Sequence, residues 1–259
     1  GLVLSNSGDN KKALKYFHDA LKADPDNTEI NFNIATCYRK LEKYKEATYH
    51  YSKSPTIKSK SFQLECMYLS GDKDIEKFYS LLNELGSAET LYPLAASISA
   101  HASIEYSNPD PYPFCKSPFN FINKVNLFDH KDFDEHLINK FLYDVEKSHL
   151  NQRGQPLLKN GFQTSGNLFL LEYDSVKKMV KIIEEKIQDY RIKFKESDAG
   201  IIKNWPKEYN LFGWLIQIKD GGSLSSHMHN EGWLSSSIYL QRPKKINSND
   251  GDIEFCLDG

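Results

Sequence analysis

The stretch Gly8-Asp-Asn-Lys-Lys-Ala-Leu-Lys-Tyr-Phe-His-Asp-Ala-Leu-Lys-Ala-Asp-Pro25 begins with a glycine and ends on an Asp-Pro pair. Two of its residues, Ala13 and Phe17, recur as a small and an aromatic residue, Ala47 and Tyr51, each 34 positions further along the chain. A repeat of this length predicts pairs of helices, and such pairs stack because one pair cannot bury its apolar face alone. We therefore expect a helical array at the N-terminal end of the chain.

The residues around this period strengthen the assignment. Gly8, Tyr38 and Tyr44 stand where the tetratricopeptide repeat has small and aromatic residues, so residues 1–58 resemble such repeats. A shortened third unit follows over Ser61–Leu85. The resemblance implies either a concave surface that binds a protein or peptide partner, or a scaffold that orients the next domain, and both interpretations stay open.

The array is expected to end before a proline-rich connector. A further helix is predicted over Glu89–Glu105, and Asn108-Pro-Asp-Pro-Tyr-Pro113 then excludes both helix and central strand. We predict a helical repeat domain over 1–106, a connector over 107–126 and a second domain over 127–259.

The second domain is predicted to be α+β, with helices supporting a sheet on one side. Helical spacing of apolar residues predicts one helix over Asp132–Lys147 and a longer one that Asp174-Ser175 caps and that runs to Phe194. The predicted extended segments are Gly161–Leu171 as strand or loop, Leu211–Ile218 ending in a turn at Asp220–Gly222, Trp233–Leu240, and Asp252–Cys256. Two aromatic residues in these segments, Trp214 and Trp233, are expected in the core.

The stretch Gly221-Gly-Ser-Leu-Ser-Ser-His-Met-His-Asn-Glu-Gly-Trp-Leu-Ser-Ser-Ser-Ile-Tyr-Leu240 is the main functional lead. Side chains alternate between the two faces of an extended segment, so His227 and His229 project to the same side. Imidazole is the commonest metal ligand and suits zinc, copper, iron and nickel. The alternative is a pair of surface histidines, or a core histidine that a backbone carbonyl satisfies.

Composition narrows the functional classes. The chain has 259 residues, of which 39% are hydrophobic and 13% aromatic, as is typical of globular rather than disordered proteins. The formal charge of −2 gives no reason to expect nucleic acid or an anionic membrane as a partner. The cysteines lie far apart, without Cys-x-x-Cys spacing, which favours a reduced cytoplasmic protein. The most apolar run, Leu91–Ile104, is too short to span a bilayer.

Both ends of the chain indicate a fragment of a longer protein. The sequence opens on Gly-Leu-Val-Leu without an initiator methionine and stops at Gly259, in what is predicted to be a strand and turn. We therefore expect the sheet of the second domain to be incomplete.

Several segments together resemble the 2-oxoglutarate- and iron(II)-dependent oxygenases that follow tetratricopeptide repeats in bacteria. These segments are Gly161–Phe169, Trp214, Gly221–Gly222, His227–Leu240 and Pro243. The resemblance covers about residues 110–259 and implies a truncated double-stranded β-helix, or jelly roll, similar to that of prolyl hydroxylases. It also implies Fe(II) as the metal, 2-oxoglutarate as co-substrate and hydroxylation as the reaction.

The resemblance also assigns residues. His227 matches the first metal ligand, and His229 stands where prolyl hydroxylases carry a carboxylate, so the carboxylates of Glu231 or Asp252 matter for the charge at the metal. The distal histidine and the arginine that binds the oxoacid are expected beyond Gly259. By family analogy, the oxoacid pocket is lined by Tyr239, Ser235 and Gln217, each of which has a simple alternative as a core or solvated side chain.

Two other functions stay open. In one, the repeats recruit a protein partner and the β-helix domain is a degenerate, metal-free remnant. In the other, the metal is zinc and the domain is a cupin-like enzyme. Iron uptake with oxoacid turnover, partner binding without metal, and tight zinc binding without the oxoacid distinguish the three interpretations.

Overall fold

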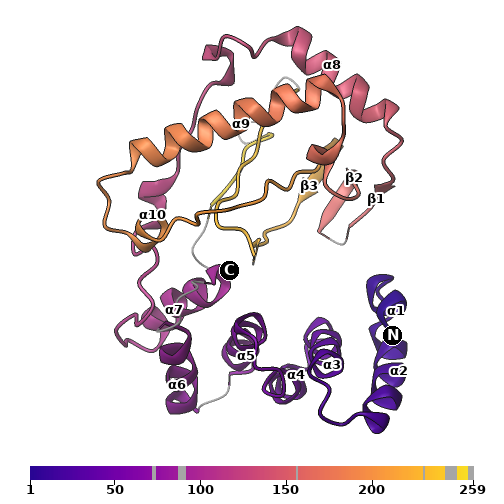
Figure 1. Ribbon diagram of the computed structural model, residues 1–259, viewed down its shortest axis with the longest axis vertical. Helices are drawn as coiled ribbons and strands as arrows, with labels where there is room; N and C mark the ends of the chain where they lie inside the picture. Colours follow the sequence, from indigo (N-terminus) through magenta and orange to yellow (C-terminus); the bar gives the residue numbers. More distant parts are fainter. Residues whose placement is uncertain (72–73, 87–91, 156, 230, 243–249, 256–259) are drawn as a thin grey trace. The chain divides into compact units, whose positions relative to one another are not determined.

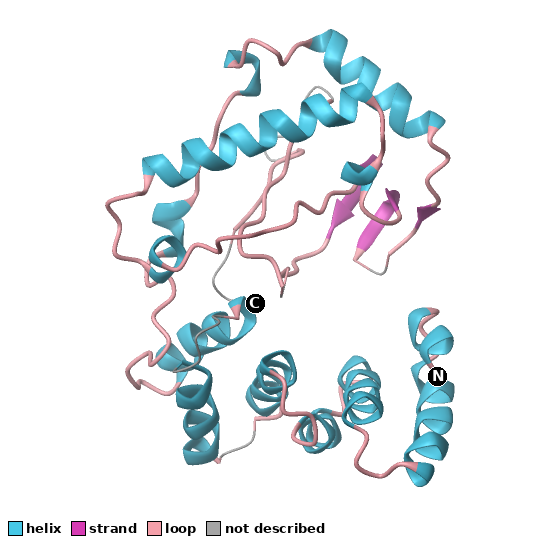
Figure 2. Ribbon diagram, viewed as in Figure 1, coloured by secondary structure: helices cyan, strands magenta, loops and turns pink. Residues whose placement is uncertain are grey.

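The fold is described by a computed structural model that covers residues 1–71, 74–86, 92–155, 157–229, 231–242 and 250–255 (Figure 1). The chain forms two compact units. Unit 1 comprises Gly1–Lys116, Ala199–Ile201 and Asn230–Trp233, and unit 2 comprises Ser117–Asp198, Ile202–His229 and Leu234–Gly259. Helices dominate the secondary structure, beside one small sheet, as Figure 2 shows. The fold class is therefore α+β.

Unit 1 is helical. Its elements are α1 (Leu2–Asn6), α2 (Asn10–Ala23), α3 (Thr28–Lys40), α4 (Tyr44–Tyr51), α5 (Ile57–Leu69), α6 (Ile75–Gly86) and α7 (Pro93–Glu105). Local side chains define where several of them begin: Asp9, Asn27 and Thr56 each accept a hydrogen bond from a backbone N–H in the first turn. Successive helices pack on one another from α1 through α6, and α7 packs on α5 and α6. The predicted helical array is confirmed in the described part, where the first strand begins only at Gln152.

The core of unit 1 contains the residues that carry the sequence repeat. Ala13, Ala47 and Tyr51 are completely buried, and Phe17 is 7% exposed. Tyr51 stacks on Phe62 with ring centroids 5.7 Å apart. The 34-residue period therefore marks the positions at which neighbouring helices contact each other.

The proline segment after α7 belongs to this core. Tyr112 is 3% exposed, and its hydroxyl oxygen accepts a hydrogen bond from the backbone N–H of Tyr92 at 2.7 Å. Asp110 accepts hydrogen bonds from the Ser99 hydroxyl and from the backbone N–H of Tyr112. The segment is thus neither helix nor strand, as its prolines predict, and it packs on the helices of unit 1. The exact limits of the three predicted domains stay a prediction.

Unit 2 places two helices beside a small sheet. Its helical elements are η1 (Pro118–Phe121), η2 (Leu127–Asp129), α8 (Glu135–Lys147), η3 (Leu168–Leu170) and α9 (Asp174–Lys193), and the short α10 (Gly200–Lys203) contains residues of both units. The strands β1 (Gln152–Arg153), β2 (Leu158–Thr164) and β3 (Ile216–Leu224) form an antiparallel sheet in the order β1-β2-β3.

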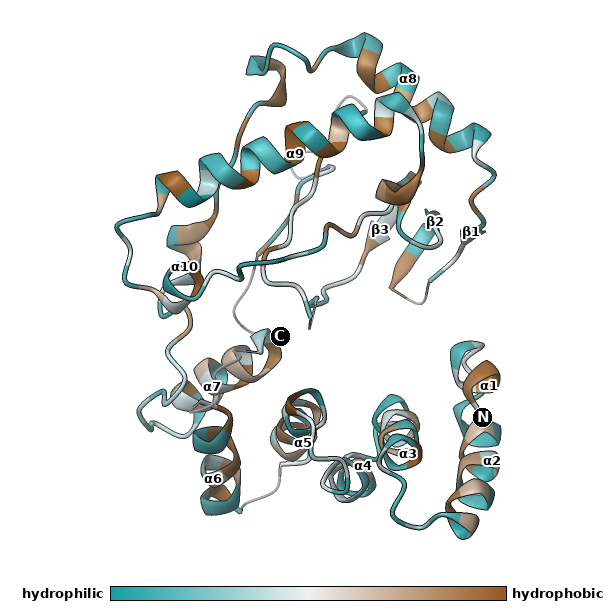
Figure 3. Cartoon of the chain, viewed as in Figure 1, coloured by the Kyte–Doolittle hydropathy of each residue, from teal (hydrophilic) through white to brown (hydrophobic). Residues whose placement is uncertain are grey.

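The two predicted helices of unit 2 are confirmed. Asp134 caps α8 by accepting a hydrogen bond from the backbone N–H of Leu137. Apolar and polar residues alternate around α9, as Figure 3 shows, and Val176, Met179 and Ile182 on its apolar face are at most 2% exposed. They pack with apolar residues of α8 in one core. Asp174 is the first residue of α9 rather than its cap.

The strand predictions were less accurate. β3 does not end at Asp220–Gly222 but runs through this turn-like sequence to Leu224. Gly221 has φ +68°, and the register between β2 and β3 shifts between Lys159 and Gly161, so a bulge replaces the predicted turn.

No strand forms over Trp233–Leu240 or over the described part of Asp252–Cys256, whose last residue lies outside the described residues, as does Pro243. A strand requires a hydrogen-bonded neighbour, and among the described residues none pairs with either segment. Propensity alone therefore overestimated the sheet. None of the described helices is long and apolar enough to cross a membrane.

Candidate functional site

The candidate site lies just after β3, in unit 2. The strand pairing between Leu158 and Leu224 continues for one more hydrogen bond, from the backbone N–H of Ser225 to the carbonyl of Leu157 at 2.8 Å. The chain then leaves the sheet, and His227 follows two residues later. The sheet therefore determines where the histidine segment starts.

The hydrogen bond of His227 defines its tautomer. Nδ1 of His227 lies 2.8 Å from the carbonyl oxygen of Ser225. A carbonyl oxygen can only accept, so Nδ1 carries the proton and donates it. In the neutral ring this leaves the lone pair on Nε2, and a ring oriented through a backbone carbonyl is the usual arrangement of a metal-binding histidine.

The ring of His229 contacts that of His227. Their centroids are 5.0 Å apart with an interplanar angle of 80°, so the two imidazoles that alternation predicted on one side do lie together. Desolvation by neighbouring groups, and secondarily the charge of His227, lower the pKa of His229 below its ordinary value of 6.5, although the residue as a whole is exposed. A lowered pKa favours the neutral form, which is the form that binds metals.

The separation of the two rings can be compared with that expected at a metal centre. A nitrogen–metal bond of about 2.1 Å places the ring centre about 3.2 Å from the ion, so two rings bound at about 90–110° stand about 4.5–5.2 Å apart. The observed 5.0 Å lies in this range. This separation is compatible with two ligands of one ion, and it is also an ordinary spacing for two aromatic rings in contact.

A complete ligand set is not present in the part of the chain that the structure describes. There, no group of at least three histidine, cysteine or acidic side chains is arranged to hold a metal. Glu231, in unit 1, forms an ion pair with Lys58 and accepts a hydrogen bond from the Tyr92 hydroxyl at 3.4 Å. Asp252 pairs with Arg242 at 3.3 Å. Both carboxylates that we considered as neighbours of the metal thus have cationic partners.

The residues predicted to line the oxoacid pocket lie in unit 2, and none of these described residues is bonded to the histidines. Gln217 lies on β3 opposite Phe162, Ser235 is exposed, and Tyr239 is 48% exposed with the Arg242 guanidinium 5.1 Å from its ring centre. Among the described residues, no hydrogen bond or ring contact joins any of the three to either imidazole. Their assignment to a pocket stays a prediction.

Two contacts of the histidines were not foreseen from the sequence. Trp214, expected in the core, is half-buried, and its ring centroid is 5.3 Å from that of His229. Ser225 contributes its carbonyl to His227. The tryptophan could only have been noted as an aromatic residue in a predicted strand, and a backbone carbonyl leaves no signal in a sequence.

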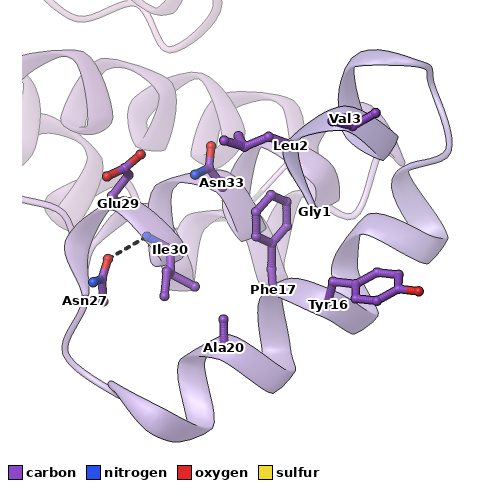
Figure 4. A pocket seen from close by; sticks show the side chains of 10 residues that line it. All are labelled: Gly1, Leu2, Val3, Tyr16, Phe17, Ala20, Asn27, Glu29, Ile30 and Asn33. Atoms are coloured by element: carbon purple, nitrogen blue, oxygen red, sulfur yellow. Dashed lines mark hydrogen bonds between the residues drawn. The ribbon is translucent and has the colours of Figure 1, made fainter.

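Unit 1 carries a second kind of candidate site, a groove of about 480 Å³ near the N-terminus (Figure 4). Phe17, Ala20 and Ile30 provide apolar surface, while Glu29 and Asn33 add polar groups. The backbone N–H of Ile30 is bonded to the Asn27 side chain, so the first turn of α3 is fixed at one edge of this groove. A partly apolar groove with a few polar groups is typical of a binding surface.

Comparisons with known proteins identify a family only for part of unit 1. No curated protein and no solved structure matches the chain significantly. A family model described as tetratricopeptide repeat matches residues 6–48, which include α2, α3 and most of α4. The N-terminal helices of this chain therefore contain a tetratricopeptide repeat, a fold that commonly mediates protein–protein interaction.

Proposed function

We propose that the protein is a 2-oxoglutarate- and Fe(II)-dependent oxygenase whose repeats bind a protein or peptide partner. In this proposal unit 2 belongs to a double-stranded β-helix, of which β1, β2 and β3 are one part. The sequence resemblance motivates the reaction class. The repeat match supports the interaction module and not the chemistry.

The observation that carries the metal proposal is the pairing of His227 with His229. Their 5.0 Å centroid separation suits two ligands of one ion, and the Ser225 carbonyl leaves Nε2 of His227 as a lone-pair donor.

The roles of the residues follow from this geometry. His227 and His229 would hold the metal with neutral nitrogens, so the ion would keep its full positive charge toward further ligands. Bound iron would supply the activation of dioxygen and of the oxoacid. Tyr239, Ser235 and Gln217 are proposed to contact the oxoacid through hydroxyl and amide groups.

The test is anaerobic titration of the purified protein with Fe(II), followed by an assay of 2-oxoglutarate decarboxylation. Loss of a residue that only orients a metal ligand typically weakens binding by about 10–100-fold. We expect His227→Ala and His229→Ala, which remove the ligands themselves, each to weaken metal binding by at least this factor. The matched control is His136→Ala, because His136 is an exposed histidine on α8.

Each contrary outcome has a distinct meaning. If both histidine variants keep iron, the site lies elsewhere and the proposal fails. If His229→Ala keeps iron while Glu231→Ala loses it, the second ligand is the carboxylate. Tight zinc binding without 2-oxoglutarate binding would favour the cupin-like enzyme instead.

A second function, partner binding without catalysis, is favoured by the groove of unit 1. Phe17 and Ile30 are among the apolar residues that line it. Peptides selected from a displayed library on the wild-type chain should bind less tightly to Ile30→Asp, which places a charge in this apolar lining. Glu84→Ala, on α6, is the control. If the selected peptides bind Ile30→Asp as tightly as wild type, the groove is not the partner site.

A further inference from the structure

The two histidines are held in different ways. His227 is oriented by a hydrogen bond to the Ser225 carbonyl. His229 makes no hydrogen bond with the described residues, and its ring contacts are those with His227 and Trp214. An imidazole without a hydrogen-bonded partner depends on packing for its orientation.

Trp214 has a fixed position because the backbone on both sides of it is bonded to one neighbouring segment. The N–H of Gly213 donates to the Asn167 side chain at 3.0 Å, and the N–H of Leu215 donates to the Thr164 hydroxyl at 3.0 Å. The carbonyls of Gly213 and Leu215 accept from Leu168 and Thr164 at 2.9 and 3.0 Å. These bonds hold the backbone on both sides of Trp214 and so determine where its side chain begins.

The histidine segment starts from the same strand. Ser225 is bonded to Leu157, next to the first residue of β2, while Thr164 is the last residue of β2. One strand therefore determines the positions of both Trp214 and the start of the histidine segment. The rings of Trp214 and His229 lie 5.3 Å apart, tilted by 45°, between these two supported segments.

We infer that Trp214 is a positioning residue for the metal site: its indole orients the His229 imidazole, as the Ser225 carbonyl orients that of His227. The inference rests on the proposed metal site and assigns Trp214 no contact with the metal. A flat ring beside an imidazole limits its rotation without consuming either ring nitrogen. His229 thereby keeps both nitrogens available, whereas His227 has committed Nδ1.

The experiment compares Trp214→Leu and Trp214→Phe with wild type, using Co(II) alone as the probe. Visible absorption of Co(II) reports the geometry of its ligands, and titration gives the affinity. We expect Trp214→Leu to bind Co(II) about 10–100-fold more weakly and with a changed spectrum, as is typical when an orienting group is lost. Trp214→Phe retains a ring and should stay close to wild type.

Two controls separate positioning from damage to the fold. Trp205→Phe alters a tryptophan of the same unit that contacts Tyr190 instead of a histidine, and it should leave the Co(II) spectrum unchanged. Circular dichroism and the thermal unfolding midpoint establish that each variant is folded. Unchanged affinity and spectrum in folded Trp214→Leu would overturn the inference.

A metal-free measurement makes the inference independent of the outcome for the proposed function. Three-bond NMR couplings about χ1 of His229 report whether its side chain keeps one rotamer, and Trp214→Leu should change them toward the average of a freely rotating histidine. If wild type binds no Co(II), the proposed function fails, and this measurement alone decides the positioning role. His229 couplings that are identical in wild type and folded Trp214→Leu would refute it.

Discussion

Ser175 donates its hydroxyl hydrogen to the carboxylate of Asp144 over 2.7 Å, which joins the first turn of α9 to the last turns of α8. Both residues are buried, at 3% and 2% exposure. The same carboxylate accepts a hydrogen bond from Lys140 at 2.7 Å. A buried carboxylate of this kind is stable only while its partners satisfy it.

Removing the hydroxyl should destabilise unit 2. In Ser175→Ala the Asp144 carboxylate loses a buried donor, and we expect the thermal unfolding midpoint to fall by about 2–8 °C. Lys140→Ala removes a donor whose side chain is 53% exposed, so water can replace it and the midpoint should fall less. Calorimetry of the two variants provides the test, and an equal or larger loss in Lys140→Ala would contradict it.

The same carboxylate should make stability depend on acidity. The hydrogen bond from Lys140, and then that from Ser175, lower the pKa of Asp144 below its ordinary value of 3.8. The stabilisation is therefore complete above the ordinary pKa of 3.8, and it is lost as the pH falls through the lowered pKa of the folded state. Urea unfolding of wild type and Asp144→Asn should differ at pH 6 and converge toward pH 2. A difference that persists unchanged at pH 2 would rule out this origin.

A methyl group at Gly161 should disrupt the sheet. A Cβ atom there would lie 2.6 Å from the backbone oxygen of Gln217, and backbone atoms of a paired strand cannot move aside cheaply. Gly161→Ala should cost about 1–3 kcal/mol, as is typical of an overpacked site. Gly154→Ala is the matched control, because a Cβ at Gly154 would meet no atom within 4 Å. Chemical denaturation of both variants measures the difference.

Acid should also weaken unit 1 through His50. Burial, and then the charges of His18 and Lys53, lower the pKa of His50 below 6.5. Nδ1 of His50 lies 2.9 Å from the amide oxygen of Asn31, and the His50 ring contacts the rings of Tyr38 and Tyr49. The neutral ring is thus favoured in the fold, so stability is lost as the pH falls below 6.5 and through the lowered pKa.

The measurement for His50 is the unfolding midpoint at pH 7.5 and pH 5. Wild type should lose more stability between the two than His50→Gln, which cannot take up the proton. His136→Gln, on the exposed surface of α8, should behave as wild type. An identical pH dependence in His50→Gln and wild type would exclude His50 as the cause.

The helices could be predicted because their signals are local. The repeat of Ala13 and Phe17 at Ala47 and Tyr51 corresponds to buried contacts, and Asp134 begins α8 by capping it. Strands depend on partners far away in sequence. The residues over Trp233–Leu240 have strand propensity, yet within the described part they pair with nothing.

The same contrast between local signals and distant partners holds for the histidine pair. Alternation predicted that His227 and His229 lie together, and they do, although the structure assigns no strand to them. Their surroundings come from longer-range contacts. Trp214 reaches His229 because Asn167 and Thr164 hold the segment around it, and no local pattern encodes that.

The burial of Tyr112 has a consequence for how the helical array can be lengthened. Its ring lies against Gly86 at the end of α6, and its hydroxyl is bonded to Tyr92 just before α7. A further helix pair added after α7 would have to compete with this tyrosine for the same apolar surface. We therefore expect duplication of repeats to be tolerated between the earlier helices and disfavoured here, where Tyr112 already covers part of the apolar surface.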